Sequence, residues 1–241
     1  MTEKNINGIT IRHYGDLYST NKTAIAEDNA PHLLTVVADN QSGGRGRMGR
    51  SYFSYNGGLY MSVILDVDEI KIPLSLCTPA AAVAVFDALT SFGVQGHKIK
   101  WVNDIYKDGK KVCGILTEAA SEGGKIKRVV VGIGINLTHP EGGFPEEISH
   151  KAGALGLLCN KLEVASSVAS RLRELIKAPT DSILEKYQGN MLFIGQKATV
   201  TDYADGNKKI DGKVLGVSQD GGLMFVDADG NVRILTSGEI I

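Results

Sequence analysis

The sequence predicts a main domain of strands and helices that is followed by a small all-β domain. The chain has 241 residues, which is long for one minimal domain and short for two large ones. Apolar runs of strand length alternate with helical patterns over most of the chain. After Ile194, short β-rich runs alternate with Asp-Gly and Gly-Gly turns, as in a small barrel. We therefore place a boundary at Met191 and predict domains 1–190 and 191–241.

The predicted strands are short apolar runs that are bounded by turn residues. Residues 33–38 form a continuous apolar run that suits a central strand. Residues 112–119 and 129–137 flank a Ser-Glu-Gly-Gly turn, so we expect a hairpin. The second of these strands is also a candidate sheet edge for pairing between subunits. The predicted strands of the main domain cover residues 9–11, 33–38, 59–65, 99–102, 112–119 and 129–137.

The predicted helices are recognised by their caps and by apolar residues at helical spacing. Ser19 offers N-cap chemistry to the first helix. Pro79 stands near the first turn of the second helix, and Gly93 closes that helix. The predicted helices cover residues 22–27, 80–92, 162–177 and 181–187.

Composition and charge narrow the class of protein. The net charge is −1, which does not indicate a nucleic-acid-binding surface. Cys77, Cys113 and Cys159 are scattered, and an odd number without a Cys-x-x-Cys pair indicates reduced thiols. No signal peptide is visible, and the longest charge-free run, 72–86, is short for a membrane span. We therefore expect a cytoplasmic protein with no membrane partner.

Residues 43–50 combine four glycines and three arginines in the string Gly-Gly-Arg-Gly-Arg-Met-Gly-Arg. Glycine lets a backbone approach a ligand closely, and arginine donates charge-assisted hydrogen bonds to carboxylates and phosphates. The pattern indicates a loop that binds a small anion, although it is not a P-loop. On residue types alone, a flexible solvated loop and an RGG-like nucleic-acid segment remain alternatives.

A second polar cluster follows a predicted strand at Lys100-Trp101-Val102-Asn103-Asp104. A lysine at a strand end can meet a phosphate at the mouth of a sheet, and the alternative is a surface lysine beside a core tryptophan. Asn103 and Asp104 are ordinary turn formers. Gly132 and Gly134 lie within an apolar strand, where glycine marks the close approach of another backbone or of a ligand, or else a bulge.

Together these segments resemble the biotin–protein ligase family. The resemblance spans roughly residues 10 to 140, and the β-rich tail is similar to the family's SH3-like C-terminal domain. Val102 departs from the pattern, because the family usually has Pro at this position. The resembling segments, in family order, are Ser-Thr-Asn at 19–21, Gln-Ser-Gly-Gly-Arg-Gly-Arg-Met-Gly-Arg at 41–50, Lys-Trp-Val-Asn-Asp at 100–104, Gly-Ile-Leu-Thr-Glu at 114–118 and Gly-Ile-Gly-Ile-Asn at 132–136.

The resemblance implies an α+β fold, in which a mixed β-sheet has helices packed on one face, as in class II aminoacyl-tRNA synthetases and lipoate ligases. It also implies a two-step adenylating ligase. With Mg²⁺, biotin and ATP would form biotinyl-5′-AMP, and biotin would then pass to a lysine of a biotin carboxyl carrier protein. A lipoate or octanoate ligase or transferase on the same fold is the main alternative, and a non-catalytic biotin- or nucleotide-binding regulator is another.

The same resemblance implies roles for individual residues. Lys100 and Arg47 are the expected catalytic residues, and Lys100 would bridge the biotin carboxylate and the α-phosphate. No residue is assigned to a metal, and the residues that hold Mg²⁺ are left open. The residues expected at biotin are Ser19, Thr20, Asn21, Gln41, Gly44, Arg45, Gly46, Arg47, Lys100 and Gly114, and those expected at ATP are Arg47, Arg50, Lys100 and Asn136.

Some members of the family carry an N-terminal winged helix that binds DNA. Only 18 residues precede Ser19, which are too few for such a module, so we expect a monofunctional ligase with no DNA partner. Monomer and homodimer both remain open. The glycines and arginines of 41–51 further suggest a lid that is disordered or displaced without ligand. No role in binding ATP is assigned to Arg233.

Overall fold

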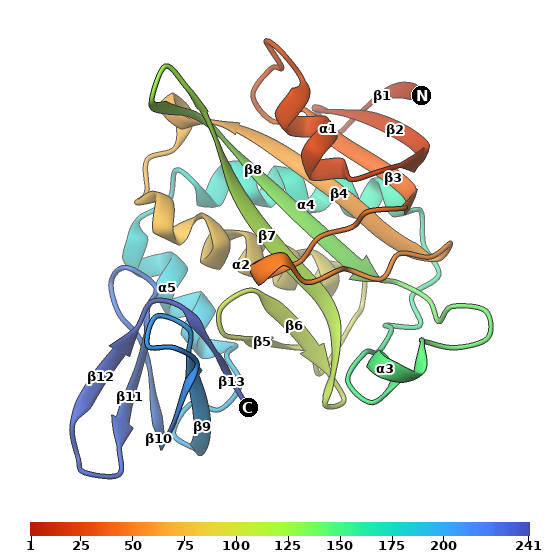
Figure 1. The fold of residues 1–241 in the computed structure, drawn as a ribbon. Coiled ribbons are helices and arrows are strands. Elements are labelled where there is room, and N and C mark those ends of the chain that lie inside the picture. Colours follow the sequence, from red (N-terminus) through yellow and green to blue (C-terminus); the bar gives the residue numbers. More distant parts are fainter.

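Two β-sheets organise the molecule (Figure 1). This computed structural model describes residues 1–241, apart from the side chain of Glu122. The large sheet contains β1 (Thr2–Ile6), β2 (Ile9–Leu17), β3 (Thr35–Gln41), β4 (Gly58–Asp66), β5 (Lys98–Lys100), β6 (Asp104–Lys107), β7 (Lys110–Glu122) and β8 (Lys125–Asn136), and the small sheet contains β9 (Lys197–Asp202), β10 (Lys208–Val217), β11 (Leu223–Asp227), β12 (Val232–Leu235) and β13 (Gly238–Ile240).

The large sheet is mixed and has the order β1-β2-β3-β4-β8-β7-β6-β5. Strands β2 and β3 are parallel, and the other neighbouring pairs are antiparallel. A parallel pair needs a crossover, and α1 lies on the chain between these two strands. The helices are α1 (Thr20–Ala26), α2 (Cys77–Ser91), α3 (Glu146–Ser149), α4 (Lys161–Leu175) and α5 (Thr180–Gly189), with 3₁₀ turns at Arg47–Gly49, Val67–Glu69 and Leu74–Leu76.

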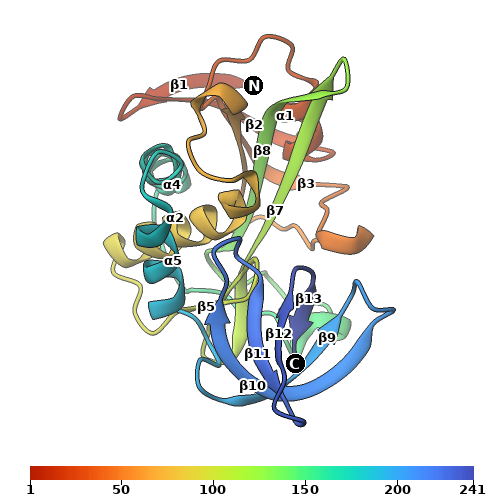
Figure 2. The same cartoon turned by 90° about the vertical axis from the view of Figure 1, so that its left-hand side faces the viewer.

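The two faces of the large sheet are covered differently (Figure 2). Helices α2, α4 and α5 pack on one face, whereas short α1 and the glycine-rich loop after β3 lie on the other. This arrangement confirms the predicted α+β fold with its main helices on one side. It also leaves the second face available for a site that the loop can cover.

Helix α2 lies in the core of the main domain. Together with the 3₁₀ turn before it, it forms an apolar stretch, Leu74–Ser91, which is long and apolar enough to cross a membrane. This stretch is longer than the charge-free run noted in the sequence, because the helix continues past Phe86. Within the fold 61% of the stretch is buried, and its alanines and valines contact other core residues. A helix that lies in the core of a folded domain can have the same length and apolar composition.

Three features of the large sheet differ from expectation. The strand predicted at 99–102 ends at Lys100 as β5, and β6 at Asp104–Lys107 was not expected because only turn residues were noted there. Strand β8 lies between β4 and β7, so the proposal that it forms a sheet edge for subunit pairing is wrong. Its continuous buried run suits a strand with neighbours on both sides. Strand β1 was not expected because its residues are polar, but the Asn7-Gly8 turn that joins it to β2 has positive φ at both positions, as a tight hairpin requires.

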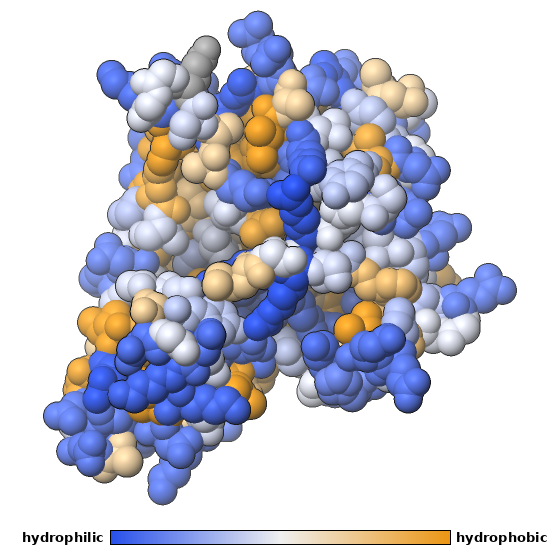
Figure 3. All heavy atoms as spheres, viewed as in Figure 1, coloured by the Kyte–Doolittle hydropathy of each residue, from blue (hydrophilic) through white to orange (hydrophobic). Residues whose placement is uncertain are grey.

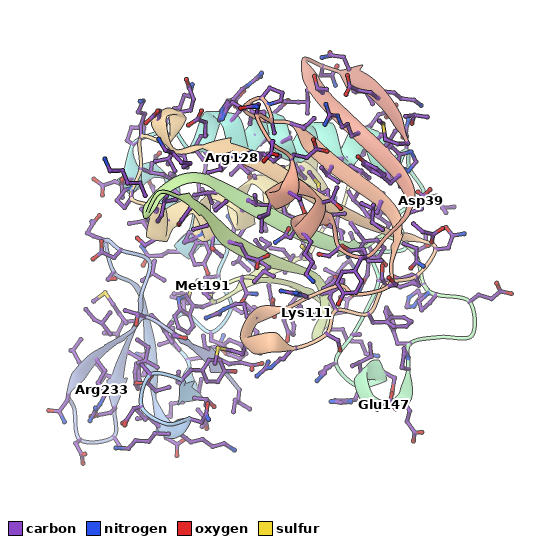
Figure 4. The ribbon with its side chains drawn as sticks, turned by 45° about the horizontal axis from the view of Figure 1, so that its top comes forward. Asp39, Lys111, Arg128, Glu147, Met191 and Arg233 are labelled. Atoms are coloured by element: carbon purple, nitrogen blue, oxygen red, sulfur yellow. The ribbon has the colours of Figure 1, made fainter. Side chains whose placement is uncertain are left out.

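The small sheet has the order β12-β11-β10-β9-β13 and is antiparallel, consistent with an SH3-like domain. It packs against the end of the large sheet where β5 finishes. The indole Nε1 of Trp101 donates to the carbonyl of Gly221 at 3.0 Å, and the backbone N–H of Val217 donates to Gln188 of α5 at 3.1 Å. Met191, at the predicted boundary, lies between the two sheets (Figure 4).

Candidate active site

A cavity of about 500 Å³ lies where three parts of the molecule meet. These are the glycine-rich loop, the small sheet and the face of the large sheet that carries α1. Figure 3 shows strongly hydrophilic side chains crossing the middle of this face. Gly44 is the one predicted site residue outside the lining, and its carbonyl accepts from the backbone of Tyr52, which does line it. The predicted residues that line the cavity are Ser19, Thr20, Asn21, Gln41, Arg45, Gly46, Arg47, Arg50, Lys100, Gly114 and Asn136.

One end of the cavity is neutral and tightly hydrogen-bonded. Ser19 caps α1, and its hydroxyl accepts from the backbone N–H of Lys22. The next residue, Thr20, donates to Gln41 Oε1 from both its backbone N–H, at 2.8 Å, and its hydroxyl, at 3.1 Å. The side chains of Ser19 and Thr20 are buried. The cap of α1 therefore joins two predicted site segments that lie 21 residues apart.

Two residues at this end were not predicted from the sequence. Ser62 of β4 is fully buried, and its Oγ lies 2.6 Å from Asn21 Oδ1 and 2.8 Å from Thr20 Oγ1. Glu118 of β7 accepts from Asn21 Nδ2 at 2.6 Å. A serine inside an otherwise apolar strand and a glutamate after an apolar run were the available signals, but only the fold brings them to Asn21.

The glycines of β8 make room for side chains. A Cβ at Gly132 would lie 2.1 Å from Asn21 Oδ1, and a Cβ at Gly134 would lie 2.6 Å from the ring of Tyr52. The register between β4 and β8 continues without a shift through both glycines, so neither is a bulge. Close approach is therefore the reason for both glycines, and it is made by side chains of α1 and of the loop.

Tyr52 follows the glycine-rich loop and anchors it to the sheet. Its hydroxyl donates to the carbonyl of Gly134 at 2.9 Å, and burial raises the pKa of the phenol well above its ordinary value. A Cβ at Gly44 would lie 2.7 Å from the carbonyl oxygen of Tyr52, so the loop needs glycine there. Gly49 has φ +72°, which is a second reason for glycine in this loop.

The other end of the cavity is cationic, and Lys100 lies at its centre. The Lys100 side chain is only 12% exposed, with Nζ 4.8 Å from the centre of the Tyr106 ring and 4.0 Å from Glu239. Burial lowers the pKa of Lys100, although the nearby carboxylates of Glu239 and Asp104 oppose this shift. Lys100 therefore lines the cavity and is not a surface lysine beside a core tryptophan.

Arginines of the loop reach across the cavity. Arg47 donates to Asn103 Oδ1 at 3.2 Å and to Ser237 Oγ at 3.5 Å. Arg50 donates to Glu239 at 3.1 Å and to the hydroxyl of Tyr203 at 2.8 Å. Ser237, Tyr203 and Glu239 belong to the C-terminal part of the chain, so both arginines connect the loop to the small sheet.

The charge state of Glu239 depends on these contacts. Burial by itself would raise the pKa of Glu239, but hydrogen bonds from Tyr203 and Arg50 outweigh that effect and hold the pKa below its ordinary value. Sequence reasoning missed Tyr203 and Glu239 because it treated the tail as a separate barrel. No motif in the sequence connects them to the loop.

Asp104 and Lys111 add an ion pair to the cavity. Asp104 had been assigned only a turn, but its carboxylate pairs with Lys111 Nζ at 2.7 Å, and both residues line the cavity. The Lys111 side chain passes close to Gly114, where a Cβ would lie 3.0 Å from its Cε. Between Lys100 and Asp104, the Trp101–Val102 peptide bond is cis.

The remaining candidates lie at the edges of the site. Asn136 is buried, and its Nδ2 donates to the carbonyl of Gly153 at 2.8 Å. Arg233 pairs with Asp227 at 2.6 Å on the small sheet, away from Lys111 (Figure 4). Among residues with described side chains, no group of three or more His, Cys, Asp or Glu is placed to hold a metal ion.

The chain is similar to known proteins along nearly its whole length. Residues 14–136 match the model of the biotin/lipoate A/B protein ligase family. The bifunctional ligase/repressor BirA of Bacillus subtilis (strain 168) is 34% identical over 92% of this chain and 70% of its own. The biotin–[acetyl-CoA-carboxylase] ligase of Mycobacterium tuberculosis is 27% identical over 86% of this chain and 78% of its own.

A solved structure is similar as well. The biotin protein ligase from Aquifex aeolicus, determined in complex with biotin and ATP, superposes with a TM-score of 0.82 at 30% sequence identity. The match covers 96% of this chain and 97% of that one, so it includes both sheets. On the family model, the relatives and this structure together, the chain belongs to the biotin/lipoate A/B protein ligase family, among its biotin protein ligases.

Proposed function

We propose that this chain is an ATP-dependent biotin–protein ligase, which forms biotinyl-5′-AMP and transfers biotin to a lysine of a biotin carboxyl carrier protein. The observation that carries the proposal is that one cavity joins a neutral hydrogen-bonding pocket to a cluster of cations. The neutral end suits a ureido ring, and the cationic end suits a carboxylate and phosphates. The family membership and the similarity to a ligase bound to biotin and ATP support the same activity.

The neutral end binds the biotin head. Ser19, Thr20 and Gln41 supply a hydroxyl, a second hydroxyl and an amide for the ureido group, and Asn21 supports them. An unpaired buried polar group costs about 1–3 kcal/mol, so a pocket of this kind favours a ligand that pairs with each of its groups. A lipoyl or octanoyl chain has no such groups, and the pocket would therefore discriminate against it.

The first step takes place at the cationic end. A carboxylate oxygen of biotin attacks the α-phosphorus of ATP, the bond from that phosphorus to the bridging oxygen breaks, and pyrophosphate leaves. Lys100 and Arg47 stabilise the negative charge that builds up on the α-phosphate. Arg45, Gly46 and Gly114 line the path of the biotin tail, and Gly44 supports it through its backbone contact to Tyr52. Arg50 and Asn136 bind the nucleotide.

In the second step, the amine of the carrier lysine attacks the acyl carbon of the adenylate, and AMP leaves. Water must be excluded until the carrier arrives, because the mixed anhydride is reactive. The loop 41–51 acts as a lid that the arginines hold over the adenylate. We predict that this loop is displaced without ligand, so biotin plus ATP should protect it from protease. Equal cleavage with and without the ligands would contradict the role of a lid.

Mg²⁺ is proposed to accompany ATP. The acidic residues that line the cavity are Asp104 and Glu239. Mg²⁺ usually binds one or two carboxylates together with substrate phosphates, so this donor set fits a nucleotide-bound ion. When bound, the ion would neutralise phosphate charge. Both carboxylates also bind cations of the chain, Asp104 pairing with Lys111 and Glu239 with Arg50.

The proposal divides the chain into a catalytic domain, 1–190, and an SH3-like domain, 191–241, which supplies Tyr203 and Glu239 to the site. One experiment tests the activity. The chain is incubated with ATP and Mg²⁺ and with biotin, lipoate or octanoate, and pyrophosphate and acylation of an acceptor domain are measured. Biotin-dependent release and labelling are expected, whereas release with lipoate or octanoate alone would identify the chain as a lipoate or octanoate ligase.

A further inference from the structure

A buried hydrogen-bond relay lies behind the neutral end of the cavity. It runs from Glu118 on β7 through Asn21 on α1 to Ser62 on β4 and then to Thr20. We propose that Glu118 is a positioning residue, which sets the direction of every hydrogen bond in this relay and thereby makes Thr20 an acceptor for a ring N–H. The inference rests on the proposed function, since it names how that site selects a ureido ring.

The direction of the relay begins at Glu118. A carboxylate only accepts hydrogen bonds, so the group of Asn21 that faces it at 2.6 Å must be the amide NH₂. The carbonyl of Leu116 also accepts from this NH₂, at 3.3 Å. Two acceptors on one side therefore fix which way the Asn21 amide is turned, and its Oδ1 must face the other side.

The orientation of Asn21 fixes which of the Ser62 and Thr20 hydroxyls donates and which accepts. Ser62 has one hydroxyl proton, and Asn21 Oδ1, 2.6 Å away, can only accept it. Ser62 Oγ is then an acceptor toward Thr20 Oγ1, 2.8 Å away, and Gln41 Oε1 is a second acceptor at 3.1 Å. Both acceptors draw the Thr20 proton away from the cavity, so Thr20 presents a lone pair to the ligand.

The packing prevents the relay from reversing. Ser62 of β4 and Leu116 of β7 are the register partners of Gly132 on either side of β8, and Asn21 lies over this glycine. Asn21 is 5% exposed, so neither a water molecule nor an alternative rotamer is available to it at low cost. The backbone N–H of Thr20 likewise orients Gln41, because it donates to Oε1 and leaves Nε2 as a donor.

The relay makes a prediction about ligand choice. A ureido ring offers N–H donors and a carbonyl acceptor, which match a Thr20 acceptor and a Gln41 donor. A carboxylic acid without such a ring would leave Thr20 and Gln41 unpaired in a buried pocket. Loss of the relay should therefore weaken binding of biotin without changing the chemistry at Lys100.

The test compares two replacements of Glu118 that have similar size. Glu118→Met removes the acceptor, whereas Glu118→Gln retains one in its amide oxygen. We expect Glu118→Met to raise the KM for biotin about tenfold or more, and Glu118→Gln to change it less than about threefold. The kcat and the KM for ATP should stay within about twofold for both, because neither variant touches the cationic end. Desthiobiotin, which keeps the ureido ring, should show the same pattern.

Ser62→Ala interrupts the relay at a second position, because it removes the hydroxyl between Asn21 and Thr20. This variant still tests the proposal if Glu118→Met does not fold. It should raise the KM for biotin as Glu118→Met does, and the thermal midpoint of each variant is compared with that of the unmodified chain. If the unmodified chain releases pyrophosphate with biotin but Glu118→Met and Ser62→Ala leave the KM for biotin within about twofold, the relay is wrong. Equal losses in Glu118→Met and Glu118→Gln would show a role for charge in place of the relay. If the unmodified chain releases no pyrophosphate with biotin, the proposed function is wrong. The proposal that the relay selects a ureido ring is then wrong as well.

Discussion

The two ends of the cavity bind by different physical means. At the neutral end, Ser19, Thr20, Asn21 and Ser62 are buried, and Ser62 is hydrogen-bonded to Thr20 and Asn21 across the sheet and α1. At the cationic end, Arg50 is 62% exposed and reaches across from a loop to Glu239 on the small sheet. One end is a fixed part of the core, and the other is assembled from separate segments.

The difference indicates how recognition and closure are divided. Buried, fully paired groups have few alternative arrangements, so they discriminate between ligands by shape and by hydrogen-bond direction. Exposed ion pairs contribute little to stability and are screened by salt, so they can open and close without unfolding the chain. The neutral end should therefore control the choice of substrate, and the cationic end should control the rate of reaction and the retention of the adenylate.

The largest effect is expected from removing the central cation. Lys100→Ala should reduce adenylation about 10²–10³-fold, because the cation proposed to stabilise the α-phosphate would be lost. Pyrophosphate release with biotin and ATP measures this, and Lys98→Ala, at the exposed first residue of the same strand, is the matched control. Near-normal activity of Lys100→Ala would rule out its catalytic role.

A methyl group at Gly132 should disturb the neutral end. Gly132→Ala places a Cβ 2.1 Å from Asn21 Oδ1, so Asn21 must move. We expect a loss of about 1–3 kcal/mol in the free energy of unfolding, measured in urea, together with a higher KM for biotin. Gly15→Ala is the control, since β2 leaves open space there. An unchanged KM for biotin would show that the neutral end tolerates movement.

Removing Arg47 should loosen the cationic end without preventing folding. In Arg47→Gly the contacts to Asn103 and Ser237 are lost, and with them a cation that lines the cavity. We expect biotinyl-5′-AMP to leave the enzyme several-fold faster, because charge-assisted hydrogen bonds to the adenylate would be missing. Release is followed by trapping free adenylate after a single turnover. Retention equal to that of the unmodified chain would contradict the role given to Arg47.

The smallest effect is expected at the exposed end of the lid. Glu239→Gln should change the free energy of unfolding by only about 0–1 kcal/mol, since Arg50 and Glu239 are partly exposed. It should still speed proteolysis of the loop 41–51. The pKa of Glu239 lies below its ordinary value of 4.5, so its contribution is complete above that value and is lost as the pH falls through the lowered pKa. Pepsin should therefore cleave the loop of the unmodified chain faster as the pH falls through this pKa. A cleavage rate that does not rise would contradict this assignment.

Several elements were predictable because their signals are local. The cap at Ser19, the terminating Gly93 and the hairpin between β7 and β8 all follow from neighbouring residues. Eleven of the twelve predicted site residues also line one cavity, and Gly44 is the exception. Glu118 and Glu239 were not identified in advance, because their partners lie 97 and 189 residues away along the chain.

The sequence by itself indicated most of the strands and helices, a loop at residues 43–50 that is suited to binding a small anion, and the family. Each depends on residues that are near one another in the chain. Only the tertiary structure decided that β8 is a central strand, that Gly132 makes room for Asn21, and that the small sheet supplies Glu239 to the site. These facts depend on strand order, register and the packing of one sheet against another, which are set by burial across the whole chain and not by any local pattern.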